Sequence, residues 1–316
     1  MSEVSDALRG RSFTRINDWN HDELLLCLDL ADELKALQCR REEHRLLPGR
    51  TLALIFNRPS LRTRVSFEVA MSHLGGSAVD LRREDILLGE REPLRDSALV
   101  LSRYVDAVMI RTPAQEDVDA FAAAATLPVI NGLTDVTHPC QALTDLMTIR
   151  EQLGRLSGVR LAYLGDGNNV CRSLMRAAAK FGLRFIGACP PGREPSAEAV
   201  RHTRQVAIQQ GGAVEMVSDP REAATGAHVL YTDVWTSMGQ EAERERRRAE
   251  LSALGYTIDA ELLDLADRDA VVMHCLPAHA GEEITQDVLY GPRSIAWEQA
   301  ENRLHAQKAL LALVVR

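Results

Sequence analysis

Apolar and polar positions along the chain fall into blocks that alternate between strand-like runs and helical stripes. Nine short apolar runs are typical of buried strands, at residues 51–56, 78–81, 107–110, 129–131, 159–165, 184–188, 213–217, 229–233 and 271–274. Helical patterns separate most of these runs, and this alternation predicts an α/β protein built on parallel sheets. Four runs precede residue 140 and five follow it, so we expect two sheets.

Longer stripes predict helices between and after the sheets. Residues 141–156 carry apolar side chains at approximately helical spacing, which predicts a helix that links two α/β layers. Residues 295–315 have a similar pattern and predict a terminal helix. Residues 241–250 are a mixed run of Glu and Arg at i, i+3 and i, i+4 spacings, which favours a solvated helix or a mobile loop.

Composition narrows the class of protein. A chain of 316 residues exceeds what one small core usually serves, so two domains are expected. A net charge of −8 argues against nucleic acid as the main partner. No apolar run approaches the roughly 18 residues that span a bilayer, and no signal peptide is visible. The six scattered cysteines form no Cys-x-x-Cys pair, which favours reduced cytosolic thiols over a zinc or redox site.

Residues 58–68 combine three arginines and three hydroxyl side chains directly after the run 51–56. A helix beginning near Ser60 would point the N–H groups of its first turn at an anion attracted by Arg62 and Arg64. Phosphate fits this segment, because planar guanidinium groups match its oxygens in pairs. The alternative is a capped surface helix with a basic face.

Two further polar clusters follow expected strands. Arg111 comes directly after 107–110, where open α/β sheets place their ligand crevices, although a surface ion pair is also common there. Residues 138–141 (His-Pro-Cys-Gln) begin the linking helix and would leave His138 and Gln141 on one face. These two side chains could bind a carbonyl oxygen and an NH₂ group, or could be a helix cap and a buried histidine.

Residues 165–169 (Gly-Asp-Gly-Asn-Asn) follow an expected strand and precede a helical pattern, as dinucleotide-binding loops do. Val170 replaces the third glycine of that motif, and the next strand ends without the acidic residue that would bind a ribose hydroxyl. We therefore interpret Asn168 and Asn169 as hydrogen-bonding groups for a polar substrate, or as helix-capping residues.

The last two clusters follow the final two strands. Asp233 could bind the ammonium of an α-amino acid, while turn amides, Ser237 and Asn169 could bind its carboxylate. An ordinary strand-to-loop cap is equally compatible with this segment. Residues 274–277 (His-Cys-Leu-Pro) place an imidazole and a thiol at a strand end, where Cys275 could be a nucleophile, a polar contact or a buried structural thiol.

Taken in order, these clusters resemble the ornithine carbamoyltransferase family along nearly the whole chain. The family's carbamoyl phosphate motif, usually Ser-Thr-Arg-Thr-Arg, appears as Ser60-Leu61-Arg62-Thr63-Arg64. The resemblance implies other carbamoyl phosphate contacts at Arg111, His138, Gln141, Cys275, Leu276 and Arg303. It implies ornithine contacts at Asn169, Asp233, Ser237 and Met238, and catalytic roles for Arg62, His138, Cys275 and Arg303.

Two positions depart from the family pattern. Leu61 replaces the common threonine, which removes a hydroxyl near the phosphate but keeps the backbone N–H, so we expect function to survive. Leu87 stands about where many members have a glutamine that contacts carbamoyl phosphate. A weaker affinity for carbamoyl phosphate, or compensation by another residue, is therefore expected.

The implied reaction converts carbamoyl phosphate and L-ornithine to L-citrulline and phosphate, in arginine metabolism. Carbamoyl phosphate would bind first, with its carbamoyl group held partly by the backbone carbonyl of Cys275 or Leu276. Asp233 is assigned mainly to the α-ammonium of ornithine, and Cys275, coupled to His274, to the δ-nitrogen. No step needs a metal or an organic cofactor.

The resemblance also implies the architecture. We expect two doubly wound parallel-sheet domains joined by linking helices, with the C-terminal helix returning to the N-terminal domain. The carbamoyl phosphate domain would be 1–148 with 293–316, and the ornithine domain 149–292. Cytoplasmic homotrimers, or assemblies of trimers, would share the loop 85–95 between subunits, and the segment 237–255 would move when ornithine enters.

Three other functions are compatible with parts of the sequence. A related transferase could use putrescine, N-acetylornithine or aspartate, although Asp233 and the 237–239 turn suit a free α-amino acid head. A nicotinamide-dependent oxidoreductase would need a cofactor at residues 165–169, where the third glycine is missing. A non-catalytic paralogue would be expected to lose several polar positions, whereas only Leu61 and Leu87 depart.

Overall fold

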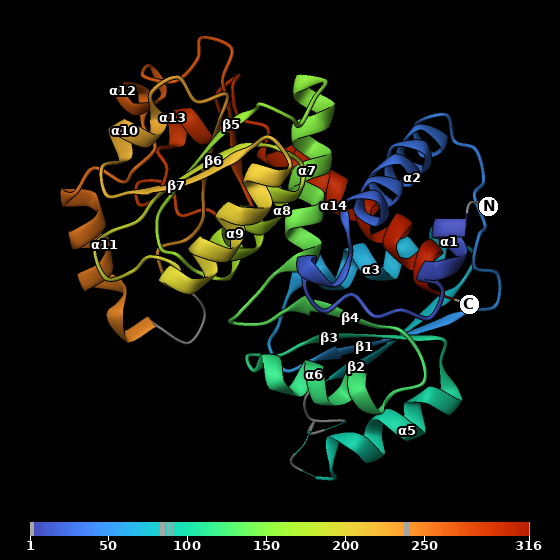
Figure 1. Cartoon of the computed structure of the whole chain (residues 1–316). Helices are drawn as coiled ribbons and strands as arrows, with labels where there is room; N and C mark the ends of the chain where they lie inside the picture. The colour runs from blue at the N-terminus through green and yellow to red at the C-terminus, as the bar shows by residue number, and fades with distance from the viewer. Residues whose placement is uncertain (1–2, 83–85, 87–88, 90, 237–240, 316) are drawn as a thin grey trace. The chain divides into compact units, whose positions relative to one another are not determined.

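Figure 1 shows the computed structural model, which describes all residues except 1–2, 83–85, 87–88, 90, 237–240 and 316. The chain divides into two compact units. The first unit is Met1–Met147 with Glu301–Arg316, and the second is Thr148–Ala300. Both boundaries fall inside helices, α7 (Pro139–Leu153) and α14 (Ala296–Val314), so each of these helices contributes residues to both units.

The first unit contains a four-stranded parallel sheet in the order β2-β1-β3-β4. Its strands are β1 (Thr51–Phe56), β2 (Ser77–Arg82), β3 (Ala107–Arg111) and β4 (Val129–Leu133). The chain adds β2 on one side of β1 and then β3 and β4 on the other, so winding reverses between β1 and β3. Open α/β sheets bind ligands at the carboxyl ends of strands beside such a reversal, here Phe56 and Arg111, which are register partners.

Helices cover both faces of this sheet. They are α1 (Glu3–Leu8), η1 (Ile16–Asp18), α2 (His21–Cys39), α3 (Leu61–His73), α5 (Leu94–Tyr104) and α6 (Gln115–Ala124). Apolar side chains of α5 and α6, including Ala98, Val118 and Phe121, pack in one core with Ile55 and Ile110. Helix α3 lies on the opposite face (Figure 1). Because β1 and β3 are covered on both faces, they are continuous apolar runs.

The second unit contains a five-stranded parallel sheet in the order β7-β6-β5-β8-β9. Its strands are β5 (Arg160–Leu164), β6 (Arg184–Ala188), β7 (Ala213–Val217), β8 (Val229–Thr232) and β9 (Val271–His274). Its other helices are α8 (Asn169–Lys180), α9 (Ala197–Gln209), α10 (Pro220–Ala224), η2 (Glu241–Glu243), α11 (Arg244–Ala253), α12 (Ala260–Leu263) and α13 (Gln286–Leu289). Winding reverses between β5 and β8, whose last residues Leu164 and Thr232 are register partners.

The expected fold class is confirmed, and all nine expected strands are present within two residues of their expected ends. The linking helix α7 is shorter than the expected 141–156, because Gly154 adopts a φ of 70° directly after Leu153 and ends the helix. The run 241–250 is largely helical, in η2 and α11. None of the described helices combines the length and apolar character that crossing a membrane requires.

The C-terminal helix returns to α2 through a buried lysine. Lys308 on α14 is fully buried, and its Nζ donates hydrogen bonds to Leu34 O at 3.3 Å and to Gln38 Oε1 at 2.9 Å. Its Nζ also lies 3.0 Å from His44 Nε2. Since His44 Nδ1 faces the Glu42 carbonyl at 3.0 Å, Nε2 is the nitrogen that accepts from Lys308. These three partners are uncharged, and burial lowers the pKa of Lys308 to about 8.

This lysine gives the protein a pH-dependent stability that can be isolated by difference. An unfolded lysine titrates near 10.4, so between pH 8 and 10.5 the unfolded chain binds the extra proton and the folded chain gains stability as pH rises. We expect the free energy of unfolding of wild type minus that of Lys308→Met to rise by on the order of 2 kcal/mol across this window. Urea unfolding at several pH values measures this difference, with Lys180→Met as control. The prediction is contradicted if the unfolding free energies of wild type and Lys308→Met change with pH by the same amount.

Candidate functional site

The first polar cluster is built at the start of α3, where the sequence predicted a helix N-terminus. Ser60 caps the helix, and its hydroxyl accepts a hydrogen bond from Thr63 N at 3.4 Å. This capped start aims the first N–H groups of α3 beyond the carboxyl end of β1. The Leu61 side chain is 75% exposed, so the residue that departs from the family motif directs its side chain to the surface.

Two buried arginines converge on Thr63. Arg111 at the end of β3 donates to Thr63 Oγ1 at 3.3 Å, and Arg303 on α14 donates to the same oxygen at 2.7 Å. Arg303 also donates to Gln141 Oε1 at 3.0 Å, and Gln141 Nε2 donates to Asp145 Oδ1 at 2.8 Å. All of these side chains are buried. Two guanidiniums held together in a buried place repel each other, so this cluster is suited to an anion.

His138 completes the buried cluster of the first unit. It directly precedes Pro139, the first residue of α7, and is only 4% exposed. Burial, together with the charges of Arg303 and Arg111, holds the pKa of His138 well below its usual range. The ring is therefore neutral near pH 7, where it can donate one hydrogen bond to an uncharged or anionic group without competing with the arginines as a cation.

The other arginines of the segment 58–68 have protein partners. Arg58 forms an ion pair with Asp135 at 2.9 Å, and Arg64 pairs with Asp80 on β2 while its guanidinium lies 4.7 Å from the centre of the Phe56 ring. The sequence interpretation, in which Arg64 attracts an anion together with Arg62, therefore needs correction for Arg64. Arg62 itself is half-buried in the first turn of α3.

A second polar cluster lies in the second unit, at the carboxyl ends of β5, β8 and β9. Asp233 directly follows β8, and its Oδ2 accepts a hydrogen bond from Asn168 Nδ2 at 2.8 Å. Its Oδ1 accepts from the Cys275 thiol at 3.0 Å. Asn168 is the N-cap of α8, accepts from Cys171 N at 3.0 Å and receives the Tyr163 hydroxyl at 3.2 Å. The cluster thus has a fixed carboxylate beside a thiol.

His274 is held away from the thiol beside it in sequence. Its Nδ1 accepts a hydrogen bond from Leu276 N at 2.9 Å, so its Nε2 carries the proton and donates to Glu283 Oε1 at 3.1 Å. Burial raises the pKa of Glu283, but this hydrogen bond and the amide of His279 outweigh it and lower the pKa overall. The expected coupling of His274 to Cys275 is therefore wrong, since both ring nitrogens have other partners.

The charged run 241–250 supplies contacts that the sequence did not predict. Arg247 on α11 pairs with Asp166 after β5, and its Nη1 also donates to Trp235 O at 3.3 Å. Arg193 donates to the other oxygen of Asp166 at 3.3 Å. The default expectation of a merely solvated segment missed these bonds, because Arg247 and Asp166 are 81 residues apart in the chain.

The glycine loop after β5, residues 165–169, packs against the segment 193–195 of the same unit. Gly167 N donates to Arg193 O at 2.8 Å, and a Cβ at Gly167 would lie 2.5 Å from Pro195 Cδ. The glycine is therefore required for close packing of the 193–195 segment. With Asp166 bound to two arginines as well, the loop does not have the open backbone that a dinucleotide phosphate needs.

Three expected site positions lie outside the described residues: Ser237 and Met238 of the ornithine set, and Leu87. Asn169 is described; it is the first residue of α8, half-buried, and its Oδ1 accepts from Val170 N at 2.9 Å. Leu276 follows Cys275 after β9 and is half-buried.

One group in the described part of the chain has ligand atoms close enough for a metal ion. His279, Glu282 and Glu283 place one nitrogen and two carboxylate oxygens within 4.8 Å of one another. Glu282 is ion-paired with Arg244 at 2.7 Å, and Glu283 receives the hydrogen bonds of His274 and His279 N. Protein partners thus take up Glu282 and the Oε1 atom of Glu283.

The chain thus has two doubly wound units, one with a buried arginine cluster and one with a carboxylate beside a thiol, and it is a two-domain α/β protein whose polar clusters lie at strand ends, where such folds bind small molecules. Residues 11–151 match the family model "Aspartate/ornithine carbamoyltransferase, carbamoyl-P binding domain", and residues 157–314 match "Aspartate/ornithine carbamoyltransferase, Asp/Orn binding domain". The chain belongs to the aspartate/ornithine carbamoyltransferase family.

Similar proteins cover the chain almost end to end. It is 53% identical to an ornithine carbamoyltransferase of a Parafrankia species and 50% identical to that of Pyrococcus horikoshii; each match covers 98% of this chain and 97% of the relative. The solved ornithine carbamoyltransferase of Pyrococcus furiosus superposes with a TM-score of 0.95 at 50% identity, covering 98% of both chains. That of Thermus thermophilus gives 0.86 at 43% identity, covering 96% of this chain and 99% of the other.

Proposed function

We propose that this chain transfers the carbamoyl group of carbamoyl phosphate to the δ-amine of L-ornithine, giving L-citrulline and phosphate, in arginine biosynthesis. The observation that carries the proposal is the buried cluster in which Arg111 and Arg303 share the Thr63 hydroxyl. Relatives at about half identity are named ornithine carbamoyltransferases, and that of Pyrococcus furiosus is named anabolic.

Carbamoyl phosphate binds mainly to a domain of residues 1–148 with 293–316, which contains the whole first unit. Its phosphate is held by Ser60, Arg62, Thr63, Arg111 and the amide of Leu61. Its carbamoyl group is held by His138, Gln141, Arg303 and the carbonyl of Cys275 or Leu276. The hydrogen bonds from Arg303 to Thr63 and Gln141 support this assignment, because they fix the fork of the guanidinium before substrate arrives.

The transition state concentrates negative charge on the carbamoyl oxygen and on the departing phosphate. Fixed donors from Arg303 and His138 stabilise the first, and Arg62, Thr63 and Arg111 stabilise the second. The depressed pKa of His138 supports its role as a neutral donor, since burial and then the charges of Arg303 and Arg111 disfavour a proton on both nitrogens. Phosphate is a good leaving group, so the transfer needs no metal or organic cofactor.

Ornithine binds to a domain of residues 149–292, which lies within the second unit, through Asn169, Asp233, Ser237 and Met238. The sequence interpretation gave Asp233 the α-ammonium and Cys275 the δ-nitrogen. Because the Cys275 thiol lies 3.0 Å from Asp233 Oδ1, a nitrogen that reaches one group is within reach of the other. We therefore propose that Asp233 and Cys275 together bind the α-ammonium of ornithine.

The attacking amine must lose its proton. A lysine-like amine has a pKa near 10.4, so neutralising it at pH 7 costs roughly 4 to 5 kcal/mol. Nearby arginine charge and exclusion of water lower this cost, because both disfavour the ammonium form. The released proton passes to solvent, because Asp233 is assigned to the α-ammonium and a carboxylate beside the δ-nitrogen would instead favour its protonated form.

The protein acts as a cytoplasmic homotrimer or an assembly of trimers, with the loop 85–95 shared between subunits. Large apolar side chains that are exposed on the first unit support a second copy as partner; they are Leu61, Val65, Val79, Leu99, Val100 and Tyr104. All six cysteines lie in the described part of the chain and none is bridged, as expected for a reducing compartment.

The acceptor specificity tests this function. Purified protein is given carbamoyl phosphate with L-ornithine, putrescine, N-acetylornithine or L-aspartate, and phosphate and carbamoylated product are both measured. We expect kcat/KM for L-ornithine to exceed that for the other acceptors by at least about a hundredfold, because a charged group left unpaired in a polar site is costly. Preference for putrescine or N-acetylornithine would keep the phosphate assignment but overturn that of Asp233.

A further inference from the structure

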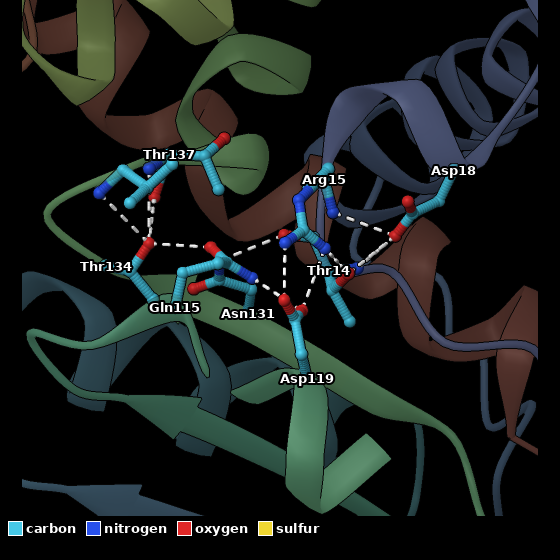
Figure 2. Close-up of polar contacts among 9 residues, drawn as sticks. Thr14, Arg15, Asp18, Gln115, Asp119, Asn131, Thr134 and Thr137 are labelled. Carbon is cyan, nitrogen blue, oxygen red and sulfur yellow. Dashed lines mark hydrogen bonds and ion pairs between the residues drawn. The ribbon is translucent and has the colours of Figure 1, made fainter. Parts of the chain in front are cut away.

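A buried polar network includes the turn 134–137, which directly precedes His138 in the chain (Figure 2). It contains Gln115, the first residue of α6, Asn131 on β4, and Thr134 and Thr137 of the turn. Each of these side chains is at most 3% exposed. None of them belongs to the substrate contacts proposed above, so substrate binding does not explain why these polar side chains are buried together.

Thr134 organises the turn. Its hydroxyl oxygen accepts from Thr137 N at 3.1 Å and from Val136 N at 3.3 Å, while Thr134 N donates to Thr137 O at 3.0 Å. The hydroxyl proton is given to Gln115 Oε1 at 2.8 Å. One side chain thus fixes both ends of a four-residue turn, and the next residue along the chain is His138.

Gln115 connects this turn to the body of the unit. Its Oε1 accepts from Thr134 Oγ1 and from Asn131 Nδ2 at 3.2 Å, and its Nε2 donates to Asp119 Oδ1 at 3.0 Å. A carboxylate only accepts, so Asp119 fixes which end of the Gln115 amide faces the turn. Arg15 holds Asp119 in turn, donating to Oδ1 at 2.8 Å (Figure 2).

The β4 strand is tied into the same network. Asn131 Nδ2 donates to Thr14 O at 2.9 Å as well as to Gln115, and Asn131 N donates to Phe13 O at 2.9 Å. Asn131 thus links the N-terminal segment and β4 to Gln115 on α6. Rigid support of this kind is what a reacting group needs when its position must hold to a fraction of an ångström.

We infer that Gln115 and Thr134 are positioning residues for His138, and that they act on carbamoyl transfer only through the place of its imidazole. This inference rests on the proposed function, in which His138 binds the carbamoyl group. The chain of contacts runs from Arg15 through Asp119, Gln115 and Thr134 to the turn, and none of its members is among the substrate contacts proposed above.

The test is a double-mutant cycle between Thr134 and His138. Thr134→Val keeps the shape of the side chain but removes the acceptor of two backbone N–H groups. We expect it to lower kcat by about 10- to 100-fold in the wild-type background. In a His138→Ala background the same change should alter kcat by less than about threefold, because the residue it positions is already gone.

Two controls separate positioning from loss of structure. Thr134→Ser keeps the hydroxyl and should restore most of the activity. Thr203→Val removes a buried hydroxyl that donates to Ala199 O at 2.7 Å on α9, and should leave kcat unchanged. If Thr134→Val does not fold, Gln115→Met replaces it in the cycle, since it removes the acceptor of the Thr134 hydroxyl.

The outcomes are distinct. Equal factors for Thr134→Val in both backgrounds would overturn the inference, as would a Thr134→Val enzyme with the activity of Thr203→Val. Failure of the wild-type protein to make citrulline would instead refute the proposed function on which the inference rests. Wild-type citrulline formation with additive Thr134 and His138 effects would leave the function standing and remove the positioning role.

Discussion

Replacing Arg303 with methionine is expected to lower kcat/KM for carbamoyl phosphate by about a thousandfold or more. The side chain is 5% exposed and donates to Thr63 Oγ1 and Gln141 Oε1, so its guanidinium is oriented before the substrate binds. Loss of a single preorganised donor to a developing oxyanion costs about 10²- to 10³-fold in other enzymes, and here a positive charge is lost with it.

Two variants make this result specific to the guanidinium. Arg303→Lys keeps the charge but cannot donate to both Thr63 and Gln141, so we expect activity between that of wild type and Arg303→Met. Arg50→Met removes an arginine paired with Asp106 at the surface, and should leave kcat/KM within about twofold. Steady-state phosphate release measures all three. Arg303→Met with nearly wild-type kcat/KM would remove Arg303 from the site.

Replacing Asp233 with asparagine is expected to raise KM for L-ornithine by about a hundredfold or more, without changing the affinity for carbamoyl phosphate. The carboxylate is 7% exposed and accepts from Asn168 Nδ2 and the Cys275 thiol. Asparagine keeps the shape but loses the charge, and its NH₂ group faces a donor. Truncating one partner of a buried charged pair typically costs about 2 to 5 kcal/mol.

Asp259→Asn is the matched control for this change. Asp259 caps α12 in the same unit and accepts from Leu262 N at 2.8 Å, and asparagine caps helices about as well as aspartate. Its kinetics should therefore equal those of wild type. Ornithine titrations followed by citrulline formation, with carbamoyl phosphate binding measured by calorimetry, separate the two substrates. A lost affinity for carbamoyl phosphate in Asp233→Asn would contradict its assignment to ornithine.

The strands could be predicted from the sequence because both sheets are parallel and covered on both faces, which makes strands such as β1 and β8 continuous apolar runs. The long helix α2 was not singled out, although Asn20 and Glu23 form a capping box at its start. Its buried residues Leu24, Cys27, Leu28, Ala31 and Leu34 also fall at helical spacing, so the sequence held both the apolar stripe and the cap as signals of this helix.

The site could be predicted as far as it depends on strand ends and one helix start. Arg111 in the first unit, and Asp233 and Cys275 in the second, each come at the end of an apolar run, and within each sheet the parallel strands bring their carboxyl ends to one edge. The partners of these groups could not be predicted in the same way. The contact of Arg303 with Thr63 spans 240 residues, and no local pattern selects Arg303 from the other arginines of the chain.

For Gln115 and Arg64, the role of the side chain could not be predicted from the local sequence. A glutamine at the first position of α6 has no chemical signature in the sequence, yet the fold makes it the support of the His138 turn. Arg64 belongs to the phosphate motif by sequence, yet the neighbouring strand β2 supplies Asp80 as its partner. In both cases the hydrogen-bond or ion-pair partner comes from another element: Asn131 on β4 and Thr134 after it for Gln115, and Asp80 on β2 for Arg64.

The measurement that bears most directly on the proposed reaction is the ratio of citrulline to phosphate formed from carbamoyl phosphate and L-ornithine by the purified wild-type protein. We expect one citrulline for each phosphate, with both products lost together in Arg303→Met. Phosphate released without citrulline would show that the second unit does not bind ornithine as proposed. No phosphate release with any acceptor would contradict the transferase function itself.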